Sequence, residues 1–199
     1  MIPLVGSLLL AYLLGSVSPS YLLGRCLKGI DLRQHGSGNV GATNAFRVLG
    51  KGPGTATLLF DIGKGYIAVR TLGDFFATNF FIPIDPLLYQ ILLGLSVIIG
   101  HNWTLFLNFK GGKGVATTFG VLLALAPWVI LWTASVWVLV TSLTRTVALG
   151  SLTAALFAPL AMLFLKEPPT LVAFSILVAV TIFYTHRSNI RNIFLNKKS

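Results

Sequence analysis

Long apolar stretches alternate with short polar segments along almost the whole chain. The apolar stretches cover residues 2–24, 54–73, 86–100, 115–142, 147–165 and 170–185. A helix needs about 20 apolar residues to cross a bilayer, and helices satisfy their own backbone hydrogen bonds there. The pattern therefore predicts an all-α, polytopic helical membrane protein, in which residues 1–199 form a single membrane-embedded domain.

The stretch 115–142 can be one long helix or two short helices broken at Pro127, since proline removes a helix hydrogen bond. If it is two, the loops 25–53, 101–114 and 143–146 share one side with the C-terminal tail. That side collects most of the basic residues: Arg25, Lys28, Arg33, Arg47, Lys51, Lys110, Lys113, Arg145, Arg187, Arg191, Lys197 and Lys198. Arg70 and Lys166 fall on the opposite side. The positive-inside rule thus favours seven transmembrane helices, two of them short, with the N-terminus outside and the C-terminus in the cytoplasm.

Composition supports a membrane setting. The chain is 55% hydrophobic and 10% charged, whereas soluble domains carry about 25% charged residues. The net charge of +10 does not indicate nucleic acid, because the basic residues lie between apolar spans, where they fit orientation signals, anionic lipid or an anionic substrate. A single cysteine, Cys26, excludes an internal disulfide. The first 24 residues lack the basic start and cleavage site of a signal peptide, so we expect a retained span.

The first polar loop is rich in glycine and asparagine and runs from Gly36 to Gly54. Glycines let backbone N–H groups approach a ligand, and successive N–H groups form an anion-binding nest, which is stronger if a helix begins at Thr43 or Asn44. The guanidinium of Arg47 suits a phosphate. The loop also matches G-x-G-x-x-G, but a dinucleotide site needs a βαβ unit that does not fit between two spans. A flexible turn is the plain alternative.

The second loop places Lys110 and Lys113 among three glycines just before a helix, in the sequence Lys110-Gly111-Gly112-Lys113-Gly114. It repeats the combination of a cation with exposed backbone amides. His101, at the start of this loop, fits a structural role better than that of a base. The third segment, Thr185 to Asn192, is a basic flank in which His186 and Asn189 share one helix face.

The acidic residues exclude several kinds of chemistry. The chain has five carboxylates, and they do not cluster in the way that Mg²⁺ requires. No His and Cys cluster indicates zinc, and there is neither a His-x₄-Asp pair nor a G-x-S-x-G nucleophile motif. We therefore expect no metal and no cofactor. A site of cations and amides suits a substrate that is already activated, such as an acyl phosphate, whose phosphate leaves easily and can accept a proton.

Three segments together resemble a known family. G-S-G-N-V-G-A-T-N, G-H-N-W with F-K-G-G-K-G-V-A-T, and T-H-R-S-N-I-R are similar to the three cytoplasmic motifs of the bacterial acyl-phosphate:glycerol-3-phosphate acyltransferases, the PlsY family. The resemblance spans essentially the whole chain. It implies transfer of a fatty acyl group from acyl phosphate to the sn-1 hydroxyl of glycerol 3-phosphate, which yields lysophosphatidic acid and phosphate, in the bacterial cytoplasmic (inner) membrane.

The resemblance also implies roles for individual residues. The expected cradle for acyl phosphate comprises Ser37, Gly38, Asn39, Gly41, Thr43 and Asn44. Arg47 and Lys113 are expected to hold glycerol 3-phosphate, with Lys110, Gly112 and Arg187 as further binding residues. His186 and Asn189, together with Ser37, are the expected catalytic residues. The expected partners are the two substrates and the lipid bilayer, without nucleic acid or metal, and the enzyme is expected to be a monomer.

Two questions stay open at this level. A transporter for a small organic phosphate would use the same cationic loops, although it also needs polar residues on the outer face; a structural lipid-binding protein would not explain the three motifs. Asp61 and Lys64 stand three residues apart within a span. They are either a structural ion pair or a support for the phosphate loop, and both are near enough to the cytoplasmic end to snorkel.

Overall fold

A computed structural model describes residues 1–195, and every regular element in that range is helical. Lys197 and Lys198, which belong to the basic side predicted from the sequence, lie outside the described residues. The chain forms two compact units, Met1–Leu125 (unit 1) and Ala126–Ser199 (unit 2). The prediction of an all-helical polytopic protein is confirmed.

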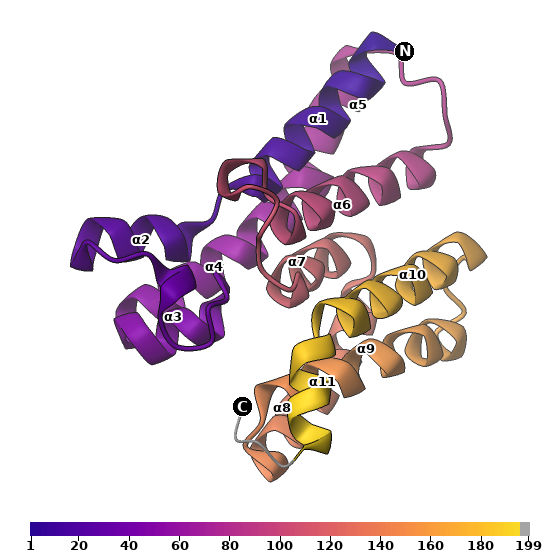
Figure 1. Cartoon of the computed structure of the whole chain (residues 1–199). Helices are drawn as coiled ribbons and strands as arrows, with labels where there is room; N and C mark the ends of the chain where they lie inside the picture. The colour runs from indigo at the N-terminus through magenta and orange to yellow at the C-terminus, as the bar shows by residue number, and fades with distance from the viewer. Residues whose placement is uncertain (196–199) are drawn as a thin grey trace. The chain divides into compact units, whose positions relative to one another are not determined.

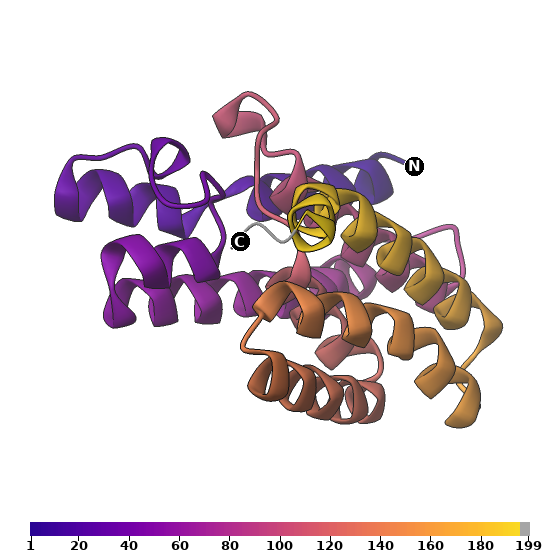
Figure 2. The ribbon, with the colours of Figure 1, turned by 60° about the horizontal axis from the view of Figure 1, so that its bottom comes forward.

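Unit 1 contains seven of the α-helices, joined by short irregular helical segments (Figure 1). The α-helices are α1 (Ile2–Ser16), α2 (Pro19–Lys28), α3 (Ala42–Leu49), α4 (Lys51–Ile67), α5 (Gly73–Asn79), α6 (Pro86–Asn102) and α7 (Val115–Leu125). The connecting segments are the 3₁₀ turns Leu32–Gln34 and Leu105–Leu107 and the π-helical turn Ala68–Leu72. Unit 2 consists of α8 (Pro127–Thr144), α9 (Val147–Phe164), α10 (Pro169–Thr185) and α11 (Arg187–Phe194). Helix α9 packs against both α8 and α10, and both views show these three helices side by side (Figure 2).

The break that was expected near Pro127 is present. Helix α7 ends at Leu125, and α8 begins at Pro127, where the missing N–H costs nothing. Stretch 115–142 is therefore two helices, and α7, with 11 residues, is one of the short ones.

A second break was not expected. The apolar stretch 2–24 is not one continuous helix, because α1 ends at Ser16 and α2 begins at Pro19. Proline pushes the residue before it out of the helical region, and Ser18 is extended, with φ −108° and ψ 96°. The same rule that located the break at Pro127 applies here.

Within residues 1–195, four segments are long and apolar enough to cross a membrane: Ile2–Lys28, which includes the break before Pro19, and Pro86–Leu107, Pro127–Thr144 and Val147–Phe164. Helices α10 and α11, which meet at a 60° bend, make a fifth if they count as one span. The expected total of seven includes shorter helices such as α7, so that total remains a prediction.

Glycines bring the helices of unit 1 into close contact. A Cβ at Gly100 of α6 would overlap the main chain of Tyr12 in α1, and one at Gly120 of α7 would overlap the main chain of Ile62 in α4. Small residues allow such approaches between membrane helices. These two contacts bring α6 against α1 and α7 against α4.

Candidate functional site

The side chain of Asn44 shapes the first glycine-rich loop. Its Oδ1 accepts a hydrogen bond from Ser37 N at 2.9 Å. Its Nδ2 donates to His35 O at 3.0 Å and to Asn39 O at 2.9 Å. Asn44 is buried, so its amide is used inside the loop, and its expected role as a ligand donor is better described as organising the cradle.

The glycine-rich part of this loop ends where α3 begins. Gly41 is the residue before the helix, and its N–H donates to Asn39 Oδ1 at 2.9 Å. The first N–H groups of a helix have no partner within that helix and attract anions. The helix begins at Ala42, one residue before the earlier of the expected starts. Gly38 has φ +71°, a conformation that disfavours residues other than glycine.

The second loop folds back on the end of α6. Gly111 N donates to Asn102 O at 3.1 Å, and Gly112 N donates to His101 O at 3.0 Å. Just before this turn, Asn108 (φ 54°) and Phe109 (φ 58°) are both left-handed. Such backbone is uncommon for residues other than glycine and concentrates at functional sites.

The two loops meet. Asn39 Nδ2 donates to Gly111 O at 3.5 Å, across 72 positions of sequence. The structure therefore brings together two of the three expected motifs within unit 1. The contact joins the start of α3 to the turn that carries Lys110 and Lys113.

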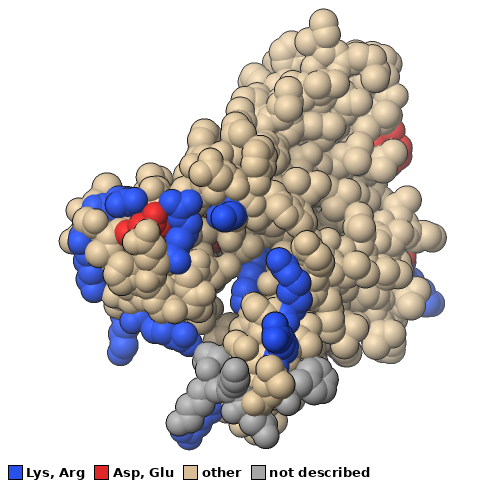
Figure 3. All heavy atoms as spheres, in the orientation of Figure 1, with Lys and Arg blue, Asp and Glu red and all other residues tan. Residues whose placement is uncertain are grey.

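Cationic side chains surround these loops. Figure 3 shows Lys and Arg side chains gathered over α2 and α3. Arg47 and Lys110 are exposed, whereas Lys113 is half-buried. Burial lowers the pKa of the Lys113 ammonium from its usual value of 10.5, because the charged form is poorly solvated there.

An ion-pair cluster lies in the chain just before the first loop. Asp31 pairs with Arg33 at 2.7 Å and with Arg25 at 3.3 Å, and both guanidinium groups lie over the ring of Tyr21. The hydrogen bond from Arg33 lowers the pKa of Asp31 from 3.8 to about 2. These cations are occupied in positioning the loop, unlike the exposed Arg47.

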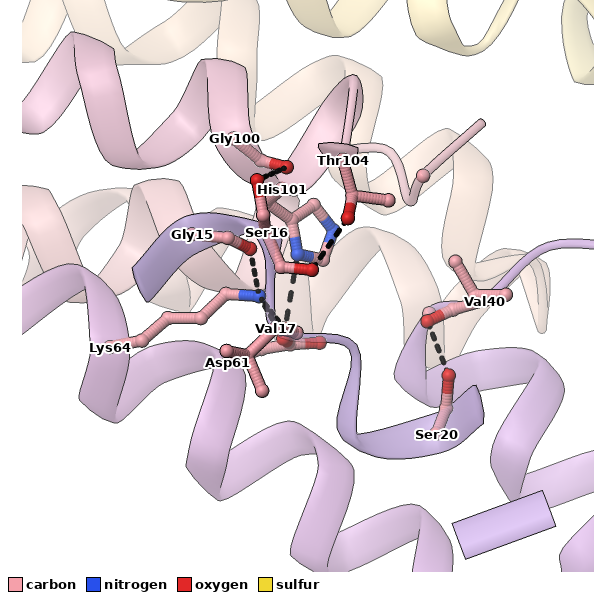
Figure 4. A network of polar contacts seen from close by, with 12 residues as sticks. Gly15, Ser16, Val17, Ser20, Val40, Asp61, Lys64, Gly100, His101 and Thr104 are labelled. Carbon is pink, nitrogen blue, oxygen red and sulfur yellow. Dashed lines mark hydrogen bonds and ion pairs between the residues drawn. The ribbon is translucent and has the colours of Figure 1, made fainter. Parts of the chain in front are cut away.

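A second cluster lies buried between the helices of unit 1. Asp61 and Lys64 form an ion pair of 2.8 Å, and both side chains are 1% exposed. Lys64 Nζ also donates to Gly15 O and Val17 O, each at 2.9 Å, and His101 Nδ1 lies 3.4 Å from Asp61 Oδ1 (Figure 4). The expectation that Lys64 can snorkel is wrong, because its ammonium is directed to main-chain oxygens within the protein. Sequence reasoning paired Asp61 with Lys64 but did not find that His101 joins them.

The third motif belongs to unit 2. His186 lies between α10 and α11, is buried, and places its Nδ1 2.9 Å from Ile182 O. Arg187 donates to Tyr184 O at 3.0 Å and lies 4.5 Å from the centre of the Tyr184 ring. Asn189 is half-buried in the first turn of α11. The bend at His186 therefore presents this motif at the end of a membrane helix.

One polar residue of the second loop stands out from its neighbours. Asn102 is 5% exposed, and neither atom of its side-chain amide has a hydrogen-bond partner within residues 1–195. Such a group calls for a water or a ligand. A Cβ at Gly114 would lie 2.7 Å from Asn102 Oδ1, so this amide lies directly under the turn. Within the same described range, no group of three or more His, Cys, Asp or Glu side chains is arranged to hold a metal ion.

The chain is similar to known proteins along almost its whole length. The model of the family described as glycerol-3-phosphate acyltransferase matches residues 5–196. "Glycerol-3-phosphate acyltransferase 2" of Moorella thermoacetica is 43% identical over 190 residues, covering 94% of this chain and 92% of its own length. The glycerol-3-phosphate acyltransferase of Acaryochloris marina is 44% identical over 195 residues, covering 94% of this chain and 87% of its own.

Two solved structures are similar in fold. The crystal structure of PlsY, an integral membrane glycerol 3-phosphate acyltransferase, in its glycerol 3-phosphate form has a TM-score of 0.88 and 35% identity, covering 98% of this chain and 94% of that one. Its lysophosphatidic acid form has a TM-score of 0.86 and 34% identity, with the same coverage.

Proposed function

We propose, from the premise that this chain belongs to the glycerol-3-phosphate acyltransferase family and is an acyltransferase of that class, that its acyl donor is acyl phosphate. The acyl group would pass to the sn-1 hydroxyl of glycerol 3-phosphate, giving lysophosphatidic acid and phosphate. The observation that carries this proposal is the Asn39–Gly111 contact. It joins two loops of glycines and cations, which suit two phosphorylated substrates.

The reaction needs little from the protein beyond positioning. The sn-1 oxygen attacks the acyl carbonyl carbon, the bond from that carbon to the phosphate oxygen breaks, and phosphate leaves with the electron pair. A phosphate oxygen takes the proton of the attacking hydroxyl, so the substrate supplies its own base. Holding the two reactants in this geometry accounts for a large part of the acceleration, and cations and N–H donors stabilise the developing charge.

Unit 1 would bind the phosphates. In this proposal, the N–H groups at the start of α3, with Ser37, Gly38, Asn39, Gly41 and Thr43, receive the acyl phosphate. Arg47 and Lys113 hold glycerol 3-phosphate, with Lys110 and Gly112 beside them. Asn44 keeps the first loop in shape through its hydrogen bonds. The unpartnered Asn102 amide adds a further donor and acceptor beneath the second loop.

Unit 2 would supply the third motif. His186 and Asn189 orient the attacking hydroxyl or the leaving phosphate, and Arg187 adds a cation nearby. This part of the proposal treats the two units as parts of one acyltransferase domain, residues 1–199. Their motifs follow α10 in unit 2 and α2 and α6 in unit 1, which the positive-inside rule assigns to the same membrane face.

The same rule sets the proposed location. The protein is integral to the membrane and crosses it several times, and we place it in the bacterial cytoplasmic membrane with its N-terminus outside. The active site and the C-terminus then face the cytoplasm. We expect the enzyme to act as a monomer, without nucleic acid, cofactor or metal.

A phosphate-release assay tests the donor and the acceptor. Purified protein is given palmitoyl phosphate with and without glycerol 3-phosphate, and phosphate and lysophosphatidic acid are both measured. Release should depend on glycerol 3-phosphate and equal the lysophosphatidic acid formed. Transfer from acyl coenzyme A but not from palmitoyl phosphate would overturn the donor assignment. Uptake of glycerol 3-phosphate into proteoliposomes without acyl transfer would instead support the transporter.

The variant His186→Ala tests the source of the base. If the substrate phosphate accepts the proton, the variant should lose turnover through lost orientation, and added imidazole should not restore it. Restoration by imidazole, following the pH dependence of imidazole ionisation, would show that a protein base takes the proton.

A further inference from the structure

Three ionisable side chains to which the proposed reaction gives no role lie together inside unit 1. We propose that Asp61, Lys64 and His101 form a positioning cluster that holds the turn 111–113 against Asn39, so that the two substrate-binding loops keep a fixed separation. This inference rests on the proposed function, because it concerns the same two loops. It assigns to a buried membrane charge the task of setting the geometry of the site.

Lys64 ties α4 to the place where α1 ends. Its ammonium lies 2.8 Å from Asp61 Oδ1 and 2.9 Å from both Gly15 O and Val17 O. Carbonyls at a helix end lack partners further along the helix, and here Lys64 provides one. A buried ion pair stabilises a fold little more than well-packed apolar groups do, so its benefit here is to fix one arrangement of α1 and α4.

His101 connects the Asp61–Lys64 pair to the second loop. Its Nδ1 lies 3.4 Å from Asp61 Oδ1, and its main-chain oxygen accepts the N–H of Gly112 at 3.0 Å. A Cβ at Gly112 would overlap His101 Nε2, so the imidazole lies directly against this glycine. Both the ring and the main chain of His101 therefore fix the residue that precedes Lys113.

The break between α1 and α2 connects the cluster to both loops (Figure 4). Thr104 Oγ1 donates to Ser16 O at 2.6 Å, and Ser16 Oγ donates to Gly100 O at 3.4 Å. On the other side of the break, Ser20 Oγ donates to Val40 O within the first loop. The short segment 15–20, which accepts two hydrogen bonds from Lys64, thus contacts the segments that carry both loops.

His101→Leu is the informative single variant, because it removes the ring nitrogens and leaves the Asp61–Lys64 pair in place. We expect kcat/KM for glycerol 3-phosphate to fall by up to about 100-fold, because a displacement of about 1 Å in a positioned group can cost that much. His101→Asn keeps a nitrogen near the position of Nδ1 and should restore most of this loss. Tyr89→Phe, which changes another buried polar group of α6, should leave kcat/KM unchanged.

Hydrogen exchange separates positioning from general stability. The amides of Gly111 and Gly112 donate to the end of α6, so they should exchange faster in His101→Leu, while amides along α4 and α6 keep their protection. A purely structural role predicts faster exchange along both helices together with a lower melting temperature. That outcome, or wild-type exchange at Gly111 and Gly112, would overturn the proposal.

Lys64→Met alone leaves Asp61 charged without its ammonium partner and can prevent folding. The double variant Asp61→Asn/Lys64→Met is neutral and keeps the side-chain volumes similar. We expect it to fold, to lose activity to the same degree as His101→Leu, and to show faster exchange at Gly112. If the wild type transfers the acyl group and both variants match it, this inference fails and the proposed function stands; if the wild type has no such activity, the proposed function itself fails.

Discussion

Units 1 and 2 bury different kinds of polar groups. Unit 1 buries a complete ion pair, Asp61 with Lys64, and joins it to His101 and to free main-chain oxygens. In the described part of unit 2, the polar contact between helices α8 and α9 is neutral, from Trp137 Nε1 to Ser151 Oγ at 3.2 Å. Charges are costly in a bilayer and are kept where they serve a function. The difference indicates that unit 1 is built to position loops, whereas unit 2 holds its helices together mainly by apolar packing.

The largest effect should follow removal of a cation that we propose binds phosphate in unit 1. We expect Arg47→Ala and Lys113→Ala each to lower kcat/KM by about 10²- to 10³-fold, with little change in melting temperature. Arg70→Ala, which removes an exposed cation elsewhere in unit 1, should remain near wild type. Near-wild-type turnover in either of the first two purified variants would contradict these assignments.

The pH dependence of activity should reveal the half-buried lysine. The pKa of Lys113 is lowered by burial, so its ammonium loses its proton at a pH below 10.5. Values of kcat/KM for glycerol 3-phosphate, which report groups of the free enzyme, should fall as the pH rises through that lowered pKa. In Lys113→Arg the fall should disappear, because arginine stays protonated; an unchanged alkaline limb would remove Lys113 as its origin.

Helix packing in unit 1 should be sensitive to small changes at chosen glycines. In Gly120→Ala the new Cβ meets the Ile62 carbonyl, so we expect a loss of about 1–3 kcal/mol. Gly63→Ala, in the opposing helix α4, has no heavy atom within 4 Å of the new Cβ and is the matched control. Thermal unfolding in detergent compares the two, and equal melting temperatures would contradict the close α4–α7 contact.

Acid should weaken the ion pairs of Asp31, which precede the first loop. Asp31 has a folded pKa of about 2 against an ordinary 3.8, so its pairing stabilises the fold above about pH 4 and is lost as the pH falls from 3.8 towards 2. The partly exposed arginines limit the gain to about 1 kcal/mol. Asp31→Asn should lower the stability at neutral pH by that amount and flatten the acid limb; an unchanged acid limb would assign it to other carboxylates.

The smallest effect is expected in unit 2. Ser151→Ala removes the acceptor for Trp137 Nε1, and such bonds between membrane helices contribute about 0.6 kcal/mol on average. Thermal unfolding should show a small shift with activity unchanged. A loss as large as that of Gly120→Ala would mean that polar contacts matter equally in both units.

Local chemistry made several features predictable from sequence. The helical class follows from the apolar stretches, and the break before α8 follows from Pro127. The break before Pro19 obeys the same rule, but the surrounding apolar residues hid it. The pairing of Asp61 with Lys64 could be read from their spacing along a helix.

Contacts between distant segments could not be predicted in this way. Asn39 and Gly111 are 72 positions apart, and Lys64 is 49 from Gly15; no periodicity relates such residues. Asn44 looked like a donor for a ligand because an exposed asparagine and a loop-organising one are identical in sequence. Its burial and its hydrogen bonds within the loop favour the second role, and both depend on the tertiary fold.

Lys64 Nζ lies among three oxygens, namely Asp61 Oδ1, Gly15 O and Val17 O. This arrangement has a consequence for how the protein inserts into the membrane. A lysine or an aspartate at the centre of a helix raises the cost of membrane insertion by about 2.5–3.5 kcal/mol, so α4 is a poor membrane segment by itself. The carbonyls of Gly15 and Val17 leave the ribosome before α4 does. In a translocon assay, α4 should therefore insert efficiently after α1 and poorly without it, and equal insertion in both cases would refute this order of assembly.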